Sequence, residues 1–343
     1  MTDPNGDRPS TTSSGEQLGW AEGNRDAPEI VELREYLRSA NGIRGLETFT
    51  PTEVDDIVRV FRRDGFVVVT DVLTPEQTAF LKAGCDDVVE QVIAIDPDRS
   101  GNRGSHRYSF GATSRTRSYL HRPEWRMLID LPTLTPIITA LFDSDDYHIR
   151  AAGGDFCLPG ATRYQPLHSD MGDFRSKEAS PHSAFQDPRG HLNTRDLPCP
   201  YICVNVLTID ATPINGATRQ IPGTQHSREP FPTLEQEPEW MRLSAVCPAP
   251  AGSVQIRDVR AWHGGTPNLS DDVRSIPNIE FFAPWFREPT TPGLRHEDYL
   301  ALSAHGRHIA RHQVIDSGEE LDLGVRLNRT PERLRTPPTP GPE

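Results

Sequence analysis

A histidine and an aspartate stand two positions apart in the stretch RYQPLHSDMGDF, residues 163–174. His168 and Asp170 lie where a run typical of a β-strand gives way to a polar loop. Because residues i and i+2 of a strand point to the same side, the imidazole and the carboxylate would face one point together. That arrangement chelates a metal ion, but two side chains alone hold a divalent ion weakly. The prediction of a metal site therefore requires a third ligand.

The third ligand that the sequence offers lies far along the chain. His263 belongs to the segment RDVRAWHGGTPNLSDDVRSIPNIEFF, residues 257–282. With His168 and Asp170 it would form a set of two histidines and one carboxylate, which leaves three positions of an octahedron open, as in non-haem Fe(II) oxygenases. The set contains no thiolate, which argues against a closed structural zinc site. We therefore predict Fe(II) bound by these three residues, which are also the predicted catalytic centre.

An arginine strengthens this prediction, because Arg274 follows His263 by eleven residues. A co-substrate that binds iron through its 2-oxo-acid end needs its far carboxylate held. A guanidinium offers a planar bidentate fork for a carboxylate, which a lysine cannot match. The HxD pair alone is a weak signal, whereas HxD, a distal histidine and this arginine together indicate a 2-oxo acid co-substrate and O2.

The elements that must position these residues begin with helices. Residues 50–64 predict a helix, 66–70 a buried strand, 74–95 a second helix and 132–142 a short third one. The capping residues are Thr50, Pro51 and Glu53 in the first helix, Thr74, Pro75 and Gln77 in the second, and Thr133 or Thr135 in the third. Gly65 supplies the C-terminal end of the first helix.

After residue 146 the pattern changes to short β-branched or aromatic runs separated by Pro, Gly, Asn and Asp. These runs are residues 147–158, 162–170, 200–210, 217–223, 252–258 and 275–286. Many short strands with turn signals predict an antiparallel barrel or a double-sheet jelly roll. We therefore expect an α+β, mainly β, fold with the N-terminal helices packed outside the β core.

Composition sets limits on the partners. The formal net charge of −13 argues against a general nucleic-acid or anionic-membrane binder, so we expect a small-molecule substrate and neither nucleic acid nor membrane. The chain lacks an apolar run of the roughly 18 residues that a transmembrane helix needs. Five scattered cysteines and a polar N-terminus predict reduced thiols in a cytoplasmic protein. The oligomeric state is not predicted.

We expect a single domain over residues 28–317, flanked by tails. Residues 1–27 are rich in Gly, Ser, Thr, Asp and Asn and predict disorder, and residues 318–343 form a Pro-rich tail. The polar segment at about 171–199 follows the HxD pair and predicts a lid over the site. The cationic segment 99–122 has two interpretations, a solvated basic loop or a loop that faces an anionic substrate or co-substrate.

Further candidates carry two interpretations each. Gln165 and Asn205 lie on predicted strands, where a buried amide needs a partner that the 2-oxo acid co-substrate or the substrate can supply. Arg107, Tyr108 and Trp262 are either packing residues or pocket contacts. His226 is either a turn residue near the site or a direct ligand. We expect His182 and His191 to be solvated in the lid and Trp285 to lie in the core.

Three segments resemble motifs of one family, the phytanoyl-CoA dioxygenase family of Fe(II)/2-oxoglutarate oxygenases. They are VFRRDGFVVVTDVLTPEQTAFL, NGATRQIPGTQH (215–226) and WHGGTPNLSDDVR, and the resemblance covers roughly residues 50–285. It implies a double-stranded β-helix core. By position it also implies that His168, Asp170 and His263 bind iron and that Arg274 clamps the C5 carboxylate of 2-oxoglutarate.

The resemblance implies a reaction class and one departure from the family. The residue two after the distal histidine, often a hydroxyl donor in relatives, is Gly265, and Thr266 is the candidate substitute. The implied reaction hydroxylates, desaturates or cyclises a small organic substrate, which we expect to be a natural-product intermediate, and releases succinate and CO2. The alternative is a metal-binding β-barrel isomerase, hydrolase or binding module without oxygenase activity.

Asp170 also predicts which atom is transferred. Halogenases that resemble this family carry a small residue at this position, which leaves room for a halide on iron. Because Asp170 fills that place, we expect oxygen insertion, desaturation or ring closure and no chlorination, and Asp170→Gly should lose hydroxylation. Mass spectrometry of the wild-type products formed in high chloride checks this, since a chlorinated main product would contradict it.

Overall fold

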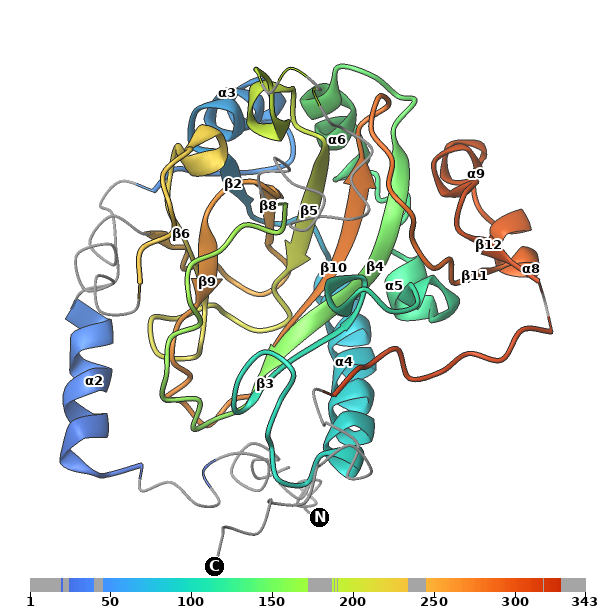
Figure 1. Ribbon diagram of the computed structural model, residues 1–343. Helices are drawn as coiled ribbons and strands as arrows, with labels where there is room; N and C mark the ends of the chain where they lie inside the picture. Colours follow the sequence, from blue (N-terminus) through green and yellow to red (C-terminus); the bar gives the residue numbers. More distant parts are fainter. Residues whose placement is uncertain are drawn as a thin grey trace, which may run out of the picture.

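Figure 1 shows the computed structural model, which describes residues 20, 25–39, 46–171, 187, 189, 191–233, 245–316 and 318–327. A seven-stranded sheet has the order β1-β2-β8-β5-β10-β4-β3, and a three-stranded sheet has the order β7-β6-β9. The predicted fold class is confirmed: the chain forms a mainly antiparallel jelly roll with helices outside it. None of the helices in the described part of the chain combines the length and the apolar character needed to cross a membrane.

The large sheet consists of β1 (Thr48–Phe49), β2 (Phe66–Val69), β8 (Val254–Asp258), β5 (Tyr201–Val206), β10 (Arg274–Phe282), β4 (His148–Cys157) and β3 (Arg107–Gly111). The small sheet consists of β7 (Ala245–Val246), β6 (Thr218–Gln220) and β9 (His263–Gly265), and β11 (Leu294–Arg295) pairs with β12 (Val314–Ile315). The α-helices are α2 (Pro28–Ser39), α3 (Val54–Asp64), α4 (Pro75–Ile95), α5 (Pro123–Arg126), α6 (Thr135–Phe142), α8 (His296–Leu300) and α9 (Ala304–Ala310). Short 3₁₀ turns are η1 (Ala112–Ser114), η2 (Tyr119–His121), η3 (Thr194–Asp196) and η4 (Thr224–His226).

The expected helix–strand–helix unit is α3, β2 and α4, and its second helix begins as predicted. The Thr74 hydroxyl accepts a hydrogen bond from the Gln77 N–H, and the Gln77 side chain accepts one from the Thr74 N–H. Gly65 ends α3 with a φ of 80°, a backbone conformation that suits glycine.

Two expected helix starts are wrong. Helix α3 begins at Val54, because the preceding residues form a turn in which the Thr50 N–H donates to the Glu53 carboxylate. Helix α6 has Leu134 at its N-cap. The two candidate threonines have other partners: the Thr133 hydroxyl donates to the Val72 carbonyl, and the Thr135 hydroxyl donates to Asp130.

The two faces of the large sheet have different roles. Ile279 and Phe281 of β10 are buried in the main hydrophobic core, where α4 and α5 contact the same strand from behind (Figure 1). Because side chains alternate along a strand, Arg274, Asn278 and Glu280 emerge on the opposite face, and all three line an internal cavity. The sheet therefore separates an apolar core from a polar cavity.

The structure reaches into both predicted tails. Trp20 packs with Leu37 and Leu269, and the Gly111 N–H donates to the Gly324 carbonyl at 2.9 Å. Residues 20, 25–27 and 318–327 of the two tails are described, and the other tail residues lie outside the described ones. So does most of the predicted lid, because only Met171, 187, 189 and 191–199 of it are described.

The capping box of α4 predicts a measurable contribution to stability. Thr74→Ala removes the side-chain acceptor for the Gln77 N–H, so we expect the free energy of unfolding to fall by about 1 kcal/mol. Urea unfolding followed by circular dichroism measures the change. The matched control is Glu90→Ala on the exposed face of the same helix, which should change the value by less than about 0.5 kcal/mol. Equal losses in both variants would contradict a role for the cap.

Candidate active site

Main-chain hydrogen bonds bring the three predicted metal-binding residues together. His168 and His263 exchange two hydrogen bonds, N–H to carbonyl, at 3.0 and 2.9 Å, and form an isolated antiparallel bridge. The Asp170 N–H donates to the Val259 carbonyl at 2.9 Å. The expected strand at 162–170 is therefore wrong, since the structure has one isolated bridge there, at His168, and no continuous ladder. Pro166 has no N–H with which to extend one.

The side-chain geometry suits a cation. The Asp170 Oδ1 lies 3.9 Å from the His168 Nε2 and 3.6 Å from the His263 Nε2. One candidate ligand atom from each residue lies within 4.8 Å of the others. In the described part of the chain, this is the one group of at least three His, Cys, Asp or Glu side chains with that geometry.

Both imidazoles are oriented by backbone carbonyls. The Nδ1 of His168 contacts the Pro166 carbonyl at 2.9 Å, and the Nδ1 of His263 contacts the Ala261 carbonyl at 3.1 Å. A carbonyl only accepts, so each Nδ1 carries the proton and each Nε2 keeps its lone pair. This is the usual arrangement for a histidine that binds a metal through Nε2.

Arg257 on β8 fixes the carboxylate. Its Nη2 donates to the Asp170 Oδ2 at 2.6 Å, which leaves Oδ1 on the side of the two histidines. Burial raises the pKa of Asp170, but its interactions with the neighbouring His263 and with the charged, hydrogen-bonded Arg257 outweigh that effect, and the pKa lies below its usual value. Burial lowers the pKa of both His168 and His263, so the imidazoles stay neutral. A carboxylate with two neutral imidazoles is the protonation state that binds a metal.

The three side chains open into a cavity of about 530 Å³ between the sheets. Arg274 lines it at the start of β10 and is 6% exposed. Its Nε and Nη1 are buried without a hydrogen-bond partner among the residues that the structure describes. Buried guanidinium N–H groups seldom remain unpaired, so this side chain is ready to receive an acceptor from a ligand.

The other predicted contacts fall into two groups. Gln165 and Asn205 line the cavity, and the Gln165 Oε1 accepts a hydrogen bond from the Gly265 N–H at 3.1 Å. Thr266 is fully buried and its hydroxyl donates to the Ala217 carbonyl at 2.7 Å, so the structure does not bring that hydroxyl into the cavity.

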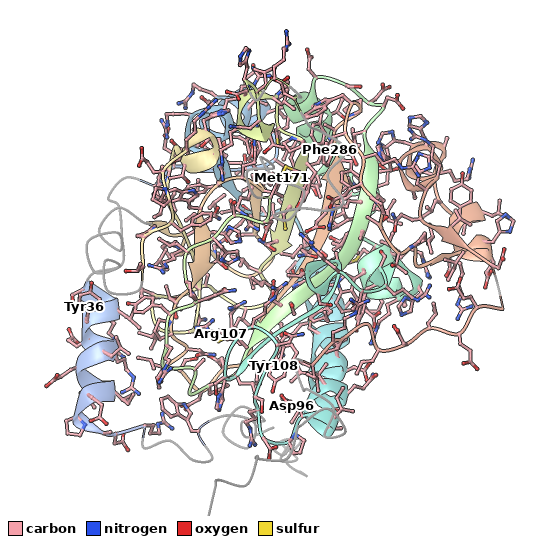
Figure 2. The ribbon with its side chains drawn as sticks, in the orientation of Figure 1. Tyr36, Asp96, Arg107, Tyr108, Met171 and Phe286 are labelled. Atoms are coloured by element: carbon pink, nitrogen blue, oxygen red, sulfur yellow. The ribbon has the colours of Figure 1, made fainter. Side chains whose placement is uncertain are left out.

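Several residues with two interpretations belong to the packing. Tyr108 combines both of its interpretations, because it lines the cavity while its hydroxyl donates to buried Asp96 and its ring stacks on Phe156. Figure 2 shows Tyr108 and Asp96 close together at the lower end of the sheet. Trp262 is buried with Leu167 and Ile221. The expectation that Trp285 lies in the core is wrong: it follows the end of β10, where its side chain is 46% exposed and its ring contacts Phe286. His191 is exposed, the His226 Nδ1 contacts the Arg195 carbonyl, and His182 lies outside the described residues.

Part of the cationic segment 99–122 faces the cavity, and part of it lies outside. Arg103, Arg107 and Arg115 line the cavity. Arg117 and Arg122 instead pair with carboxylates outside it, at Glu319 and at Asp87 and Glu124.

The sequence analysis missed several cavity side chains. Arg257, Asn278, Glu280, Arg150 and Asp155 all line the cavity. Burial raises the pKa of Asp155 to about 6, although Arg103 and Arg274 oppose that shift. Arg150 donates to Glu280 and Glu288. A signal was present, because charged or amide residues alternate with Val, Ile and Phe along β8 and β10.

Comparisons with known proteins place this chain in a family. Residues 61–276, which are 216 of 343, match the family described as phytanoyl-CoA dioxygenase (PhyH). The chain is 26% identical over 206 residues to Dioxygenase ALT11 of Alternaria alternata, and the matched part is 57% of this chain. The chain spans about 62% of the length of that curated relative.

Solved structures with a similar fold have lower identity. AviO1 from Streptomyces viridochromogenes Tue57 is 21% identical with a TM-score of 0.47, and the match covers 70% of this chain and 98% of that one. SnoK, a non-heme alpha-ketoglutarate-dependent carbocyclase from nogalamycin biosynthesis, is 19% identical with a TM-score of 0.47. That match covers 74% of this chain and 93% of the SnoK chain.

The Arg257–Asp170 pair predicts an effect on metal binding. Arg257→Met removes the bond that fixes Oδ2, so the carboxylate loses its orientation, and we expect Mn(II) or Fe(II) to bind roughly 10- to 100-fold more weakly. Titration of the ion under argon measures the affinity, with the circular dichroism spectrum as the test of folding. Arg62→Met, at an exposed position on α3, is the control. An unchanged affinity in folded Arg257→Met would show that Arg257 has no part in the site.

Proposed function

The chain belongs to the phytanoyl-CoA dioxygenase family, and from that premise we propose that it is an Fe(II)- and 2-oxoglutarate-dependent dioxygenase. In this proposal it hydroxylates a small organic substrate, or desaturates or cyclises it, and releases succinate and CO2. The observation that carries the proposal is one cavity that contains both a possible His-Asp-His metal site and the buried, unpartnered Nε and Nη1 of Arg274.

The proposed roles follow from the contacts. His168 and His263 offer their Nε2 atoms, and Asp170 offers Oδ1 while Arg257 occupies Oδ2. Fe(II) held there would activate O2 as the 2-oxo acid loses CO2, and so supply the oxidant for a C–H bond. The Arg274 guanidinium would bind the far carboxylate of 2-oxoglutarate, which orients the 2-oxo-acid end toward the metal.

Two amides complete the proposed co-substrate and substrate contacts. The Gln165 Oε1 accepts a hydrogen bond from the Gly265 N–H, so the amide N–H groups of Gln165 can donate to a ligand. Asn205 lies opposite Asn278 on the neighbouring strand, and the Asn278 Oδ1 is buried without a partner in the described structure. A bound molecule with hydroxyl or amine groups would satisfy such acceptors.

The walls of the cavity support a small polar substrate over a long acyl chain. Asp155, Asn278 and Glu280 all face it. An alkyl chain in the cavity would remove these groups from water without offering hydrogen bonds, and each such loss costs free energy. A polar natural-product intermediate would pair with them, and we propose that class of substrate.

Release of succinate tests the proposal against its rival, a metal-binding isomerase, hydrolase or binding module. The purified protein with Fe(II), 2-oxoglutarate and O2 should form succinate, and anaerobic addition of Fe(II) and 2-oxoglutarate should give a visible charge-transfer band. His168→Ala and His263→Ala should lose both signals, because two ligands do not retain the ion at micromolar metal. A wild-type protein that gives neither signal would support the rival.

The arginine fork makes a separate prediction. Arg274→Lys keeps the positive charge but loses bidentate geometry, so we expect the KM for 2-oxoglutarate to rise roughly 10- to 100-fold, about 1.5–3 kcal/mol. Steady-state succinate formation at varied 2-oxoglutarate measures it. An unchanged KM would place the carboxylate clamp at another residue.

A further inference from the structure

Gly265 leaves an empty place in the wall of the cavity, and a guanidinium fills it. A Cβ built at Gly265 would lie 2.5 Å from the Nη1 of Arg107, which is closer than real Cβ contacts. Any side chain at position 265 would therefore collide with Arg107. The position two residues after His263 has no hydroxyl to offer a ligand, but it has an arginine in the same space.

We propose that the Arg107 guanidinium occupies the space that a side chain at Gly265 would fill. With Arg274, it binds the distal carboxylate of the 2-oxo acid co-substrate. This inference rests on the proposed function, because it concerns the same co-substrate.

The sheet register directs both arginines to one place. Arg107 of β3 and Arg274 of β10 each lie opposite Cys157 of β4, on its two sides. Residues directly opposite one another in antiparallel strands project from the same face of the sheet. Their Cα atoms are two strand spacings apart, about 10 Å, and two long arginine side chains can converge across that distance on one carboxylate. Both residues line the cavity.

Arg107 is held so that one end of its fork stays free for a ligand. Its Nη2 donates to the Arg163 carbonyl at 3.0 Å and to the Thr266 carbonyl at 2.5 Å. The Nη1 lies against Gly265 at the cavity wall. Gln165 completes the wall, since its Oε1 accepts from the Gly265 N–H. The donor is therefore positioned before a ligand arrives, which reduces the entropy lost on binding.

The charges at this end of the cavity call for an anion. Arg107 and Arg274 are each 6% exposed. Burial and the neighbouring Arg107 lower the pKa of Arg274, although Cys157 and Asp155 oppose that shift. Within the described ranges, no carboxylate forms an ion pair with either guanidinium. Two buried cations in one cavity that form no ion pair are costly, and a carboxylate between them would offset that cost.

Two ligands distinguish the distal contact from the metal contact. The Mn(II)-loaded protein is titrated with 2-oxoglutarate and with 2-oxobutyrate, which keeps the 2-oxo-acid end but lacks the distal carboxylate. Arg107→Met should weaken 2-oxoglutarate binding by roughly 10- to 100-fold and change 2-oxobutyrate binding by less than about 2-fold. Calorimetry measures both without turnover, and exposed Arg62→Met is the control. An unchanged affinity for 2-oxoglutarate, or equal losses for both ligands, would overturn the proposal.

The shared space makes a second, independent test. Gly265→Ser should weaken 2-oxoglutarate binding, because its Cβ displaces the Arg107 guanidinium. In Arg107→Ala/Gly265→Ser the hydroxyl has room, so the double variant should bind 2-oxoglutarate more tightly than Gly265→Ser alone. Additive losses would contradict the exchange of the two side chains. If the wild-type protein binds neither ligand with Mn(II), it is the proposed function itself that fails.

Discussion

Two backbone hydrogen bonds between His168 and His263 are the constraint on which the rest of the site depends. They join a segment without regular secondary structure to strand β9, and they place two imidazoles side by side with ring centroids 4.4 Å apart. The Asp170 N–H then docks on Val259, which brings the carboxylate to Arg257. The side chains that could hold a metal are thus set by main-chain pairing first and by their own hydrogen bonds second.

The sequence was sufficient where a residue type has one strong physical reason to be where it is. A threonine, a proline and a glutamine at fixed spacing start α4, and an HxD pair, a distal histidine and an arginine meet in one cavity. It was insufficient where the answer depends on partners distant in the chain. Pro166 interrupts an otherwise strand-like run, and the hydroxyl of Thr266 turns to Ala217 and away from the cavity. The alternation along β8 places Arg257 on the polar face of the strand, but only the fold shows that this face lines the cavity.

Charge is distributed in opposite ways over the molecule and inside it. The whole chain carries a formal charge of −13, yet the cavity lining contains seven arginines against three carboxylates. Two of these carboxylates, Asp170 and Glu280, are already paired with Arg257 and Arg150. The remaining excess of positive charge makes the cavity favourable for an anionic ligand, although the chain as a whole is acidic.

Successive residues of strand β10 alternate between two roles, one on each face of the sheet. Arg274, Asn278 and Glu280 face the cavity, while Ile279 and Phe281 between them belong to the core. During evolution, substitutions at Asn278 or Glu280 could therefore change which substrate the cavity binds. Arg274, at the other end of the strand, would stay unchanged. A one-residue deletion within the strand has no such freedom, because it would turn Ile279 and Phe281 into the cavity and bury charges in the core. This strand should consequently evolve by substitution and almost never by insertion or deletion.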